Sequence, residues 1–99
     1  TKRNESKTSY NRLETVVAWV LNESNGKCEY CDKPAPFKRV NKRPYLEVHH
    51  VKGLADNGSD DITNAVALCA NCHRAFHYSI DRVARIDKIY KKIVRLERE

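Results

Sequence analysis

The sequence contains no methionine and no long apolar run, and both absences narrow what the chain can be. A membrane-spanning helix needs about 20 predominantly apolar residues, and no stretch of this chain approaches that length. The first residues also lack the apolar core of a secretory signal peptide. We therefore expect a cytoplasmic protein without a membrane span. Because the sequence begins at Thr1 and has no methionine, we also expect it to derive from a longer parent chain with an additional specificity domain.

Internal repeats and low-complexity stretches are missing too, and 99 residues suffice for one modest core. We predict a single domain over residues 10–99, preceded by a polar, basic lead-in over residues 1–9 that is disordered or part of a linker. Lys and Arg number 19 against 13 Asp and Glu, which gives a net charge of +6. This excess favours a polyanionic partner, either nucleic acid or an acidic membrane surface.

Two stretches show the three- and four-residue spacing of apolar side chains that predicts an amphipathic helix. The first covers residues 10–24, and Trp19 falls off its apolar stripe, so we favour core packing against another element over exposure for this side chain. The second begins near residue 71 and continues toward the C terminus, with a break near Ser79. Its last part has an apolar face, opposite a basic one, formed by Val83, Ile86, Ile89, Tyr90, Ile93, Val94 and Leu96.

Short strands are predicted between these helices. Residues 44–50 (PYLEVHH) are rich in β-branched and aromatic side chains and predict part of a short hairpin. Residues 51–64 are rich in Gly, Asn and Asp and predict an ordered loop. Residues 65–69 (AVALC) fit either a second strand or a helical turn. The predicted fold class is α+β.

The four cysteines form two Cys-x-x-Cys pairs, Cys28 with Cys31 and Cys69 with Cys72. Two such pairs can place four thiolates tetrahedrally around Zn²⁺. Residues 32–68 separate the pairs, so the predicted zinc site encloses a substantial insert.

Other uses of these cysteines are less favoured. Two disulfides or a redox Cys-x-x-Cys would suit an oxidising compartment or a thioredoxin-like βαβ pattern, and the sequence indicates neither. A C₂H₂ finger made of the first pair with His73 and His77 would need about a dozen residues between its halves, and the interval here is far longer.

All four histidines lie between Cys31 and the start of the last predicted helix. His73 and His77 have the i, i+4 spacing that lets two side chains share one helix face and one metal ion; an exposed polar face is the alternative. His49 and His50 are consecutive at the end of a predicted strand, where side chains alternate between the two faces. We therefore expect these two residues to have different roles.

The segment LEVHHVKGLADNGSDDITNAVALCANCHRAFH resembles the signature of HNH, or ββα-metal, nucleases, and CEYC resembles their zinc-stapled branch. The resemblance covers residues 28–77. It implies a small ββα-metal core with a Cys₄ zinc staple, flanked by an N-terminal helix and a long C-terminal helix. It also implies an enzyme, a metal-dependent endonuclease that hydrolyses DNA phosphodiester bonds.

The resemblance assigns roles to individual residues. His49 and His73 match metal ligands, and His77 resembles an additional ligand of the nuclease colicins. His50 matches the general base. Asn64 matches the central Asn, for which we favour pinning the loop over binding the metal. The implied cofactors are a structural Zn²⁺ and a catalytic Mn²⁺, Co²⁺, Ni²⁺, Mg²⁺ or Zn²⁺, and three imidazoles disfavour Mg²⁺ among these.

The loop departs little from the family pattern. Asn57-Gly58 stands where Gly-Gly is common, and one glycine suffices for a turn with positive φ. We interpret Asp60 and Asp61 as loop caps and solvated charges.

The implied partner is double-stranded DNA, and a homodimer is an open alternative to a monomer. Such domains serve in restriction, homing, toxin and phage packaging proteins. The predicted DNA contacts are Lys38, Arg39, Lys42, Arg43, Arg85, Lys88 and Lys92. Two other functions stay open: a zinc-stabilised DNA-binding module without catalysis, and a scaffold that oligomerises through the last helix.

Overall fold

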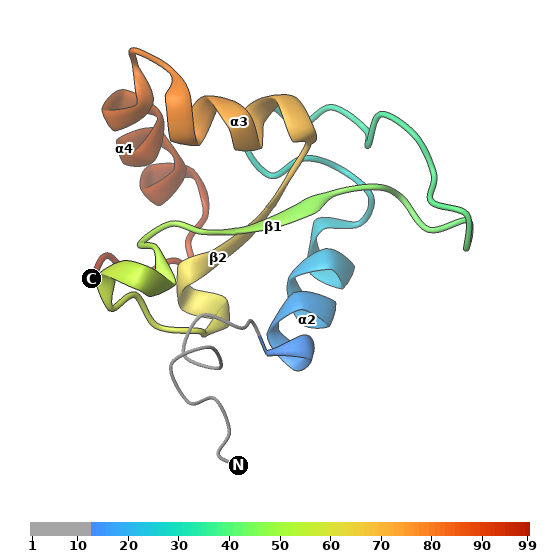
Figure 1. Cartoon of the computed structure of the whole chain (residues 1–99), viewed down its shortest axis with the longest axis horizontal. Helices are drawn as coiled ribbons and strands as arrows, with labels where there is room; N and C mark the ends of the chain where they lie inside the picture. The colour runs from blue at the N-terminus through green and yellow to red at the C-terminus, as the bar shows by residue number, and fades with distance from the viewer. Residues whose placement is uncertain (1–12) are drawn as a thin grey trace.

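A β-hairpin lies in the middle of the chain, with one helix on one side of it and two helices on the other (Figure 1). The computed structural model describes residues 13–99, so the predicted lead-in and the predicted helix start at residue 10 lie outside the described residues. The elements are helix α2 (Glu14–Ser24), strand β1 (Glu47–His50), 3₁₀ turns η1 (Leu54–Asp56) and η2 (Ile62–Asn64), strand β2 (Ala65–Leu68), and helices α3 (Ala70–Tyr78) and α4 (Arg82–Lys92). The predicted α+β class and the ββα arrangement are confirmed.

Strand β2 resolves the alternative that its sequence left open. It pairs with β1 in antiparallel register, with His50 opposite Ala65 and Glu47 opposite Leu68. All four of its residues are buried, because α2 packs against it on one side and α3 on the other. A strand covered on both faces needs a continuous apolar run rather than an alternating one, which is why periodicity could not identify it.

The core is built from one apolar stripe of each helix. Val16 and Val20 of α2, Phe76 of α3 and Ile89 of α4 are all buried around the hairpin. Trp19 is an exception to our prediction of core packing, which is wrong: its side chain is 41 % exposed, and the guanidinium of Arg95 lies 5.3 Å from its ring centroid.

The predicted break near Ser79 is confirmed, because α3 ends at Tyr78 and α4 begins at Arg82. The predicted continuation of the last helix is wrong, because α4 ends at Lys92. Two members of the predicted apolar face, Val83 and Val94, are 67 % and 94 % exposed.

The residues that follow α4 make hydrogen bonds to distant parts of the chain, and these contacts accompany the end of the helix at Lys92. Arg95 donates to both carboxylate oxygens of Glu29, at 2.9 Å each, and to the carbonyls of Ile62 and Ala65 at 3.1 and 2.8 Å. The amide of Glu97 donates to the carbonyl of Thr63 at 2.9 Å. Ile93 is extended, with φ of −104° and ψ of 104°, and the contacts that follow hold the tail against η2 and the start of β2.

Among residues 13–99, none of the helices combines the length and the apolar character that a membrane-spanning segment requires.

Candidate metal sites and their surroundings

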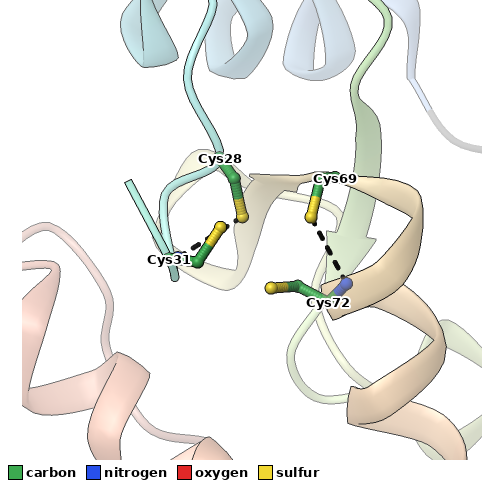
Figure 2. Close-up of side chains that lie close together, drawn as sticks. All are labelled: Cys28, Cys31, Cys69 and Cys72. Carbon is green, nitrogen blue, oxygen red and sulfur yellow. Dashed lines mark hydrogen bonds between the residues drawn. The ribbon is translucent and has the colours of Figure 1, made fainter. Parts of the chain in front are cut away.

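The four cysteine thiols converge from two separate segments (Figure 2). Cys28 and Cys31 lie in the turn that follows α2, while Cys69 caps the start of α3 and Cys72 lies in its first turn. Within each pair the first sulfur accepts the amide of the second residue, at 3.5 Å in the first pair and 3.4 Å in the second. The four sulfur atoms lie within 4.8 Å of one another. Four sulfurs bound to one Zn²⁺ at about 2.3 Å would lie about 3.8 Å apart, so the arrangement suits a metal site.

No disulfide joins any of the four cysteines. Burial raises the pKa of the Cys72 thiol far above its usual value, and the neighbouring Cys28 adds to this effect. In Cys28 burial acts in the same direction, but backbone hydrogen bonds involving Cys31, Cys69 and Tyr30 outweigh it and lower the pKa. Crowded thiols of this kind release their protons together only when a cation offsets their charge, so the donor set fits a thiolate-bound metal.

Three histidines form a second cluster at the other end of α3. His49 comes from β1, and His73 and His77 come from successive turns of α3, so that the ring centroids lie 4.9 to 5.0 Å apart. The Nε2 atoms of His73 and His77 are separated by 3.3 Å. Two imidazole nitrogens bound at about 2.0–2.1 Å to one tetrahedral ion lie about 3.3–3.4 Å apart. This cluster therefore also suits a metal ion. His73 and His77 share one face of α3 and lie together with His49, as the i, i+4 spacing predicted for a shared metal site.

Two of these imidazoles have a lowered pKa. Burial, together with the charges of the nearby His73 and His77, lowers the pKa of His49 to about 3. The pKa of His77 is lowered as well, again mainly by burial. Since only a neutral imidazole offers a lone pair to a metal, the environment favours ligation near neutral pH.

Glu47 contacts the histidine cluster, and the sequence analysis did not single it out. Its Oε1 lies 2.7 Å from Nδ1 of His73, and its Oε2 accepts a hydrogen bond from the hydroxyl of Tyr45. The Tyr45 hydrogen bond, followed by that from His73, lowers the pKa of Glu47. An ionised carboxylate on Nδ1–H leaves Nε2 of His73 free for a metal. Strand alternation is the signal that could have found it, because Glu47 and His49 are two residues apart on β1 and share a face.

His50 is not one of the three clustered histidines, and it is 7 % exposed. Its Nε2 lies 2.8 Å from Oδ1 of Asp60, whose side chain is 19 % exposed. Our interpretation of Asp60 as a loop cap or solvated charge is therefore wrong. The same interpretation is confirmed for Asp61, which caps η2 by accepting the amide of Ile62 at 2.7 Å.

Asn64 is fully buried and ties the loop between the strands together. Its Oδ1 accepts the amide of Lys52 at 2.9 Å, and its Nδ2 donates to the carbonyls of Lys52 and Ser59 at 2.9 and 2.8 Å. Gly58 lies in the same loop, where a Cβ atom would stand 1.9 Å from the Lys52 carbonyl oxygen. The left-handed conformation belongs to Asn57, with φ of 68°. The prediction that the glycine supplies the positive φ is therefore wrong, and the loop needs Gly58 for close approach instead.

A small cavity of about 130 Å³ lies beside the histidines. His49, His50, His77 and Arg82 all contribute to its wall. Within residues 13–99 no carboxylate forms an ion pair with Arg82. Asp56 also lines this cavity, which therefore brings together both histidines of the doublet, one carboxylate and one guanidinium.

The seven predicted DNA contacts fall into two groups. The side chains of Lys38, Lys42 and Arg43 make no hydrogen bond or ion pair within the described part of the chain, whereas Arg39 stacks on Tyr45 and donates to the Leu46 carbonyl at 3.2 Å. The three cations of α4 gather around the first cysteine turn. Arg85 pairs with Asp81, Lys88 lies over the Tyr30 ring, and Lys92 binds the Tyr30 carbonyl and Asp32.

Comparisons with known proteins agree with this geometry. Residues 28–79, more than half of the chain, match the family described as HNH endonuclease. The Type IV methyl-directed restriction enzyme EcoKMcrA of Escherichia coli (strain K12) is 48 % identical over 89 residues, which is 90 % of this chain and 32 % of that protein. The solved structure of the Type IV phosphorothioation-dependent restriction endonuclease ScoMcrA superposes with a TM-score of 0.77 at 27 % identity, over 93 % of this chain and 20 % of that one. The chain therefore spans a third or less of the relatives it matches.

Proposed function

The chain belongs to the HNH endonuclease family, and on that premise we propose that it is a metal-dependent domain that hydrolyses DNA phosphodiester bonds. The observation that carries the proposal is the convergence of His49, His73 and His77 on one point beside a cavity that His50 also lines. A purely structural role would not require three converging histidines and a further buried histidine beside one cavity.

We assign Zn²⁺ to the four cysteines, because their sulfur atoms lie within 4.8 Å of one another and four cysteine thiolates are a usual donor set of structural zinc sites. We assign a divalent ion to the three histidines, with Mn²⁺, Co²⁺, Ni²⁺ or Zn²⁺ preferred to Mg²⁺ because imidazole is a softer ligand than the oxygen donors Mg²⁺ selects. Such an ion supplies positive charge to a phosphate oxygen and to the leaving oxygen. Glu47 orients His73 toward it.

His50 acts as the general base. It takes one proton from a water molecule whose oxygen attacks phosphorus, and the bond from phosphorus to the 3′ oxygen breaks. The departing 3′ oxygen acquires a proton from solvent, which gives a 3′-hydroxyl and a 5′-phosphate, and His50 then returns its proton to solvent. Arg82 lines the same cavity and stabilises the negative charge that builds on the phosphate oxygens.

Asn64 holds the loop and does not move protons. Its three side-chain hydrogen bonds to Lys52 and Ser59 support this role, because they use both the oxygen and the nitrogen of the amide to hold the loop. Pinning this loop fixes the wall of the cavity opposite α3.

Double-stranded DNA is the substrate, and the free cations Lys38, Lys42 and Arg43 contact its phosphates. The α4 cations Arg85, Lys88 and Lys92 contribute where they are not neutralised by their carboxylate partners. The names of the two relatives indicate restriction of modified DNA, so we place this chain as the cleavage module of a cytoplasmic restriction enzyme whose longer parent chain carries the specificity domain.

The test is incubation of supercoiled plasmid with the chain and each divalent metal in turn. We expect nicked or linear product, faster with Mn²⁺, Co²⁺ or Ni²⁺ than with equal Mg²⁺. His50→Ala should lower the rate by about 10²–10⁴-fold while metal and DNA affinity persist, and His49→Ala should lose metal affinity as well. If the parent binds plasmid but leaves it intact with every metal, the chain is a DNA-binding module and the proposal is wrong.

A further inference from the structure

We propose that Asp60 is a positioning residue for hydrolysis, because its carboxylate holds the Nε2–H of His50 and so leaves the Nδ1 lone pair to accept the proton of water. The inference rests on the proposed function, in which His50 is the base. It goes beyond that function by naming which ring nitrogen acts and which residue selects it.

Both oxygens of the Asp60 carboxylate have a hydrogen-bond partner, which holds the carboxylate next to His50. Oδ1 of Asp60 lies 2.8 Å from Nε2 of His50, and Oδ2 accepts the amide of Leu13 at 2.6 Å. An ionised carboxylate is an acceptor only, so a hydrogen bond at this distance requires the proton to be on Nε2. A neutral imidazole carries one N–H, and its remaining nitrogen, Nδ1, is then the acceptor.

The loop that presents Asp60 is held rigidly at the residue before it. The carbonyl of Ser59 accepts a hydrogen bond from Asn64 at 2.8 Å, and the amide of Ser59 donates to the carboxylate of Glu99 at 2.9 Å. The buried Asn64 thus acts on the base through Asp60. This connection links Asn64, whose side-chain hydrogen bonds go to Lys52 and Ser59, to the base.

A carboxylate on the far nitrogen also has an electrostatic effect. When the ring accepts a proton from water it becomes an imidazolium, and a buried negative charge next to it stabilises that cation. The side chains of His50 and Asp60 are 6 % and 19 % exposed, so water screens this interaction weakly.

Asp60→Asn is the informative variant, and Asp61→Asn is its matched control. Both remove one carboxylate charge from the same loop. Within residues 13–99, however, the Asp61 side chain accepts only the Ile62 amide, which an asparagine oxygen can still satisfy. In Asp60→Asn the new amide would have one oxygen for two donors, the Leu13 amide and the His50 ring. We expect Asp60→Asn to lower kcat by about 10–100-fold, with KM for plasmid and Mn²⁺ affinity close to those of Asp61→Asn.

The second measurement reads the tautomer directly and does not depend on cleavage. Long-range ¹H–¹⁵N correlation spectra of the Zn²⁺-loaded chain at about pH 8, above the reference histidine pKa of about 6.5, distinguish Nε2–H from Nδ1–H. We expect His50, assigned by comparison with His50→Ala, to be the Nε2–H form in the parent and in Asp61→Asn, and to become a mixture in Asp60→Asn.

These outcomes separate the two proposals. If the parent does not cut, the nuclease function fails, and the spectra still decide whether Asp60 fixes His50. Equal kcat for Asp60→Asn and Asp61→Asn, or an unchanged tautomer in Asp60→Asn, would overturn the positioning role. If Asp60→Asn does not fold by thermal melting, the parent spectrum alone decides, and a predominant Nδ1–H form contradicts the inference.

Discussion

Replacing Asn64 by alanine should destabilise the chain strongly while sparing the metal site. The side chain is fully buried and makes three hydrogen bonds, two to Lys52 and one to Ser59. Each contributes about 1 kcal/mol net to the free energy of unfolding, so the substitution should lower that free energy by about 3 kcal/mol. For a domain of this size each kcal/mol lowers Tm by about 4–8 °C, which gives a fall of about 12–24 °C.

Asn64→Asp sharpens the test because it keeps the shape of the side chain. Its carboxylate can still accept the Lys52 amide, but an oxygen replaces the nitrogen that donates to the carbonyls of Lys52 and Ser59. A buried charge facing two carbonyl oxygens is costly, so this variant should be at least as destabilised as Asn64→Ala. Asn22→Ala is the control, because Asn22 is exposed on α2 and its side chain makes no hydrogen bond within residues 13–99.

Thermal melting by circular dichroism measures the stability, and Mn²⁺ titration measures the metal site. We expect both Asn64 variants to bind Mn²⁺ with the parent's affinity under conditions where they are folded. We expect them to cut plasmid slowly, because the loop that carries Asp60 has loosened. A Tm for Asn64→Ala within about 3 °C of the parent would refute the loop-pinning role. So would a variant that keeps its Tm but no longer binds Mn²⁺, since Asn64 would then be a ligand.

Cys28→Ser should release the structural metal and abolish cooperative melting, and a variant that melts at the parent's temperature would show that the staple is dispensable. Lys42→Glu with Arg43→Glu should weaken binding to all DNA sequences alike and reduce the salt slope by about 0.9 for each phosphate no longer neutralised; an unchanged slope would assign these side chains to solvent. His49 has a folded pKa of about 3 against a reference of 6.5, so between these values the unfolded chain binds a proton that the folded chain does not. The free energy of unfolding of the metal-free chain should therefore fall as pH drops from about 6.5 toward 3, by an amount on the order of 4 kcal/mol. Urea denaturation across this range should show a shallower fall for His49→Gln, and equal slopes would contradict the depressed pKa.

The spacing of residues in the sequence determined the parts of this protein that depend on local geometry. The Cys-x-x-Cys pairs predicted a shared cluster because a tight turn brings both thiols of a pair to one side. The i, i+4 spacing of His73 and His77 predicted a common face for the same kind of reason, and strand alternation separated His49 from His50. Each of these predictions needs only the backbone geometry of a few consecutive residues.

Contacts between distant segments decided the rest. No periodicity links His50 to Asp60, Glu47 to His73 or Arg95 to Glu29, because each pair meets only after the hairpin closes and α3 packs on it. Tertiary contacts also accompany the end of α4 at Lys92. The tail that follows donates a hydrogen bond to the carbonyl of Thr63 in the loop. A loop residue such as Asp60 looks like a solvated charge in the sequence, and it becomes part of the site because the fold buries it against an imidazole that has no other acceptor among residues 13–99.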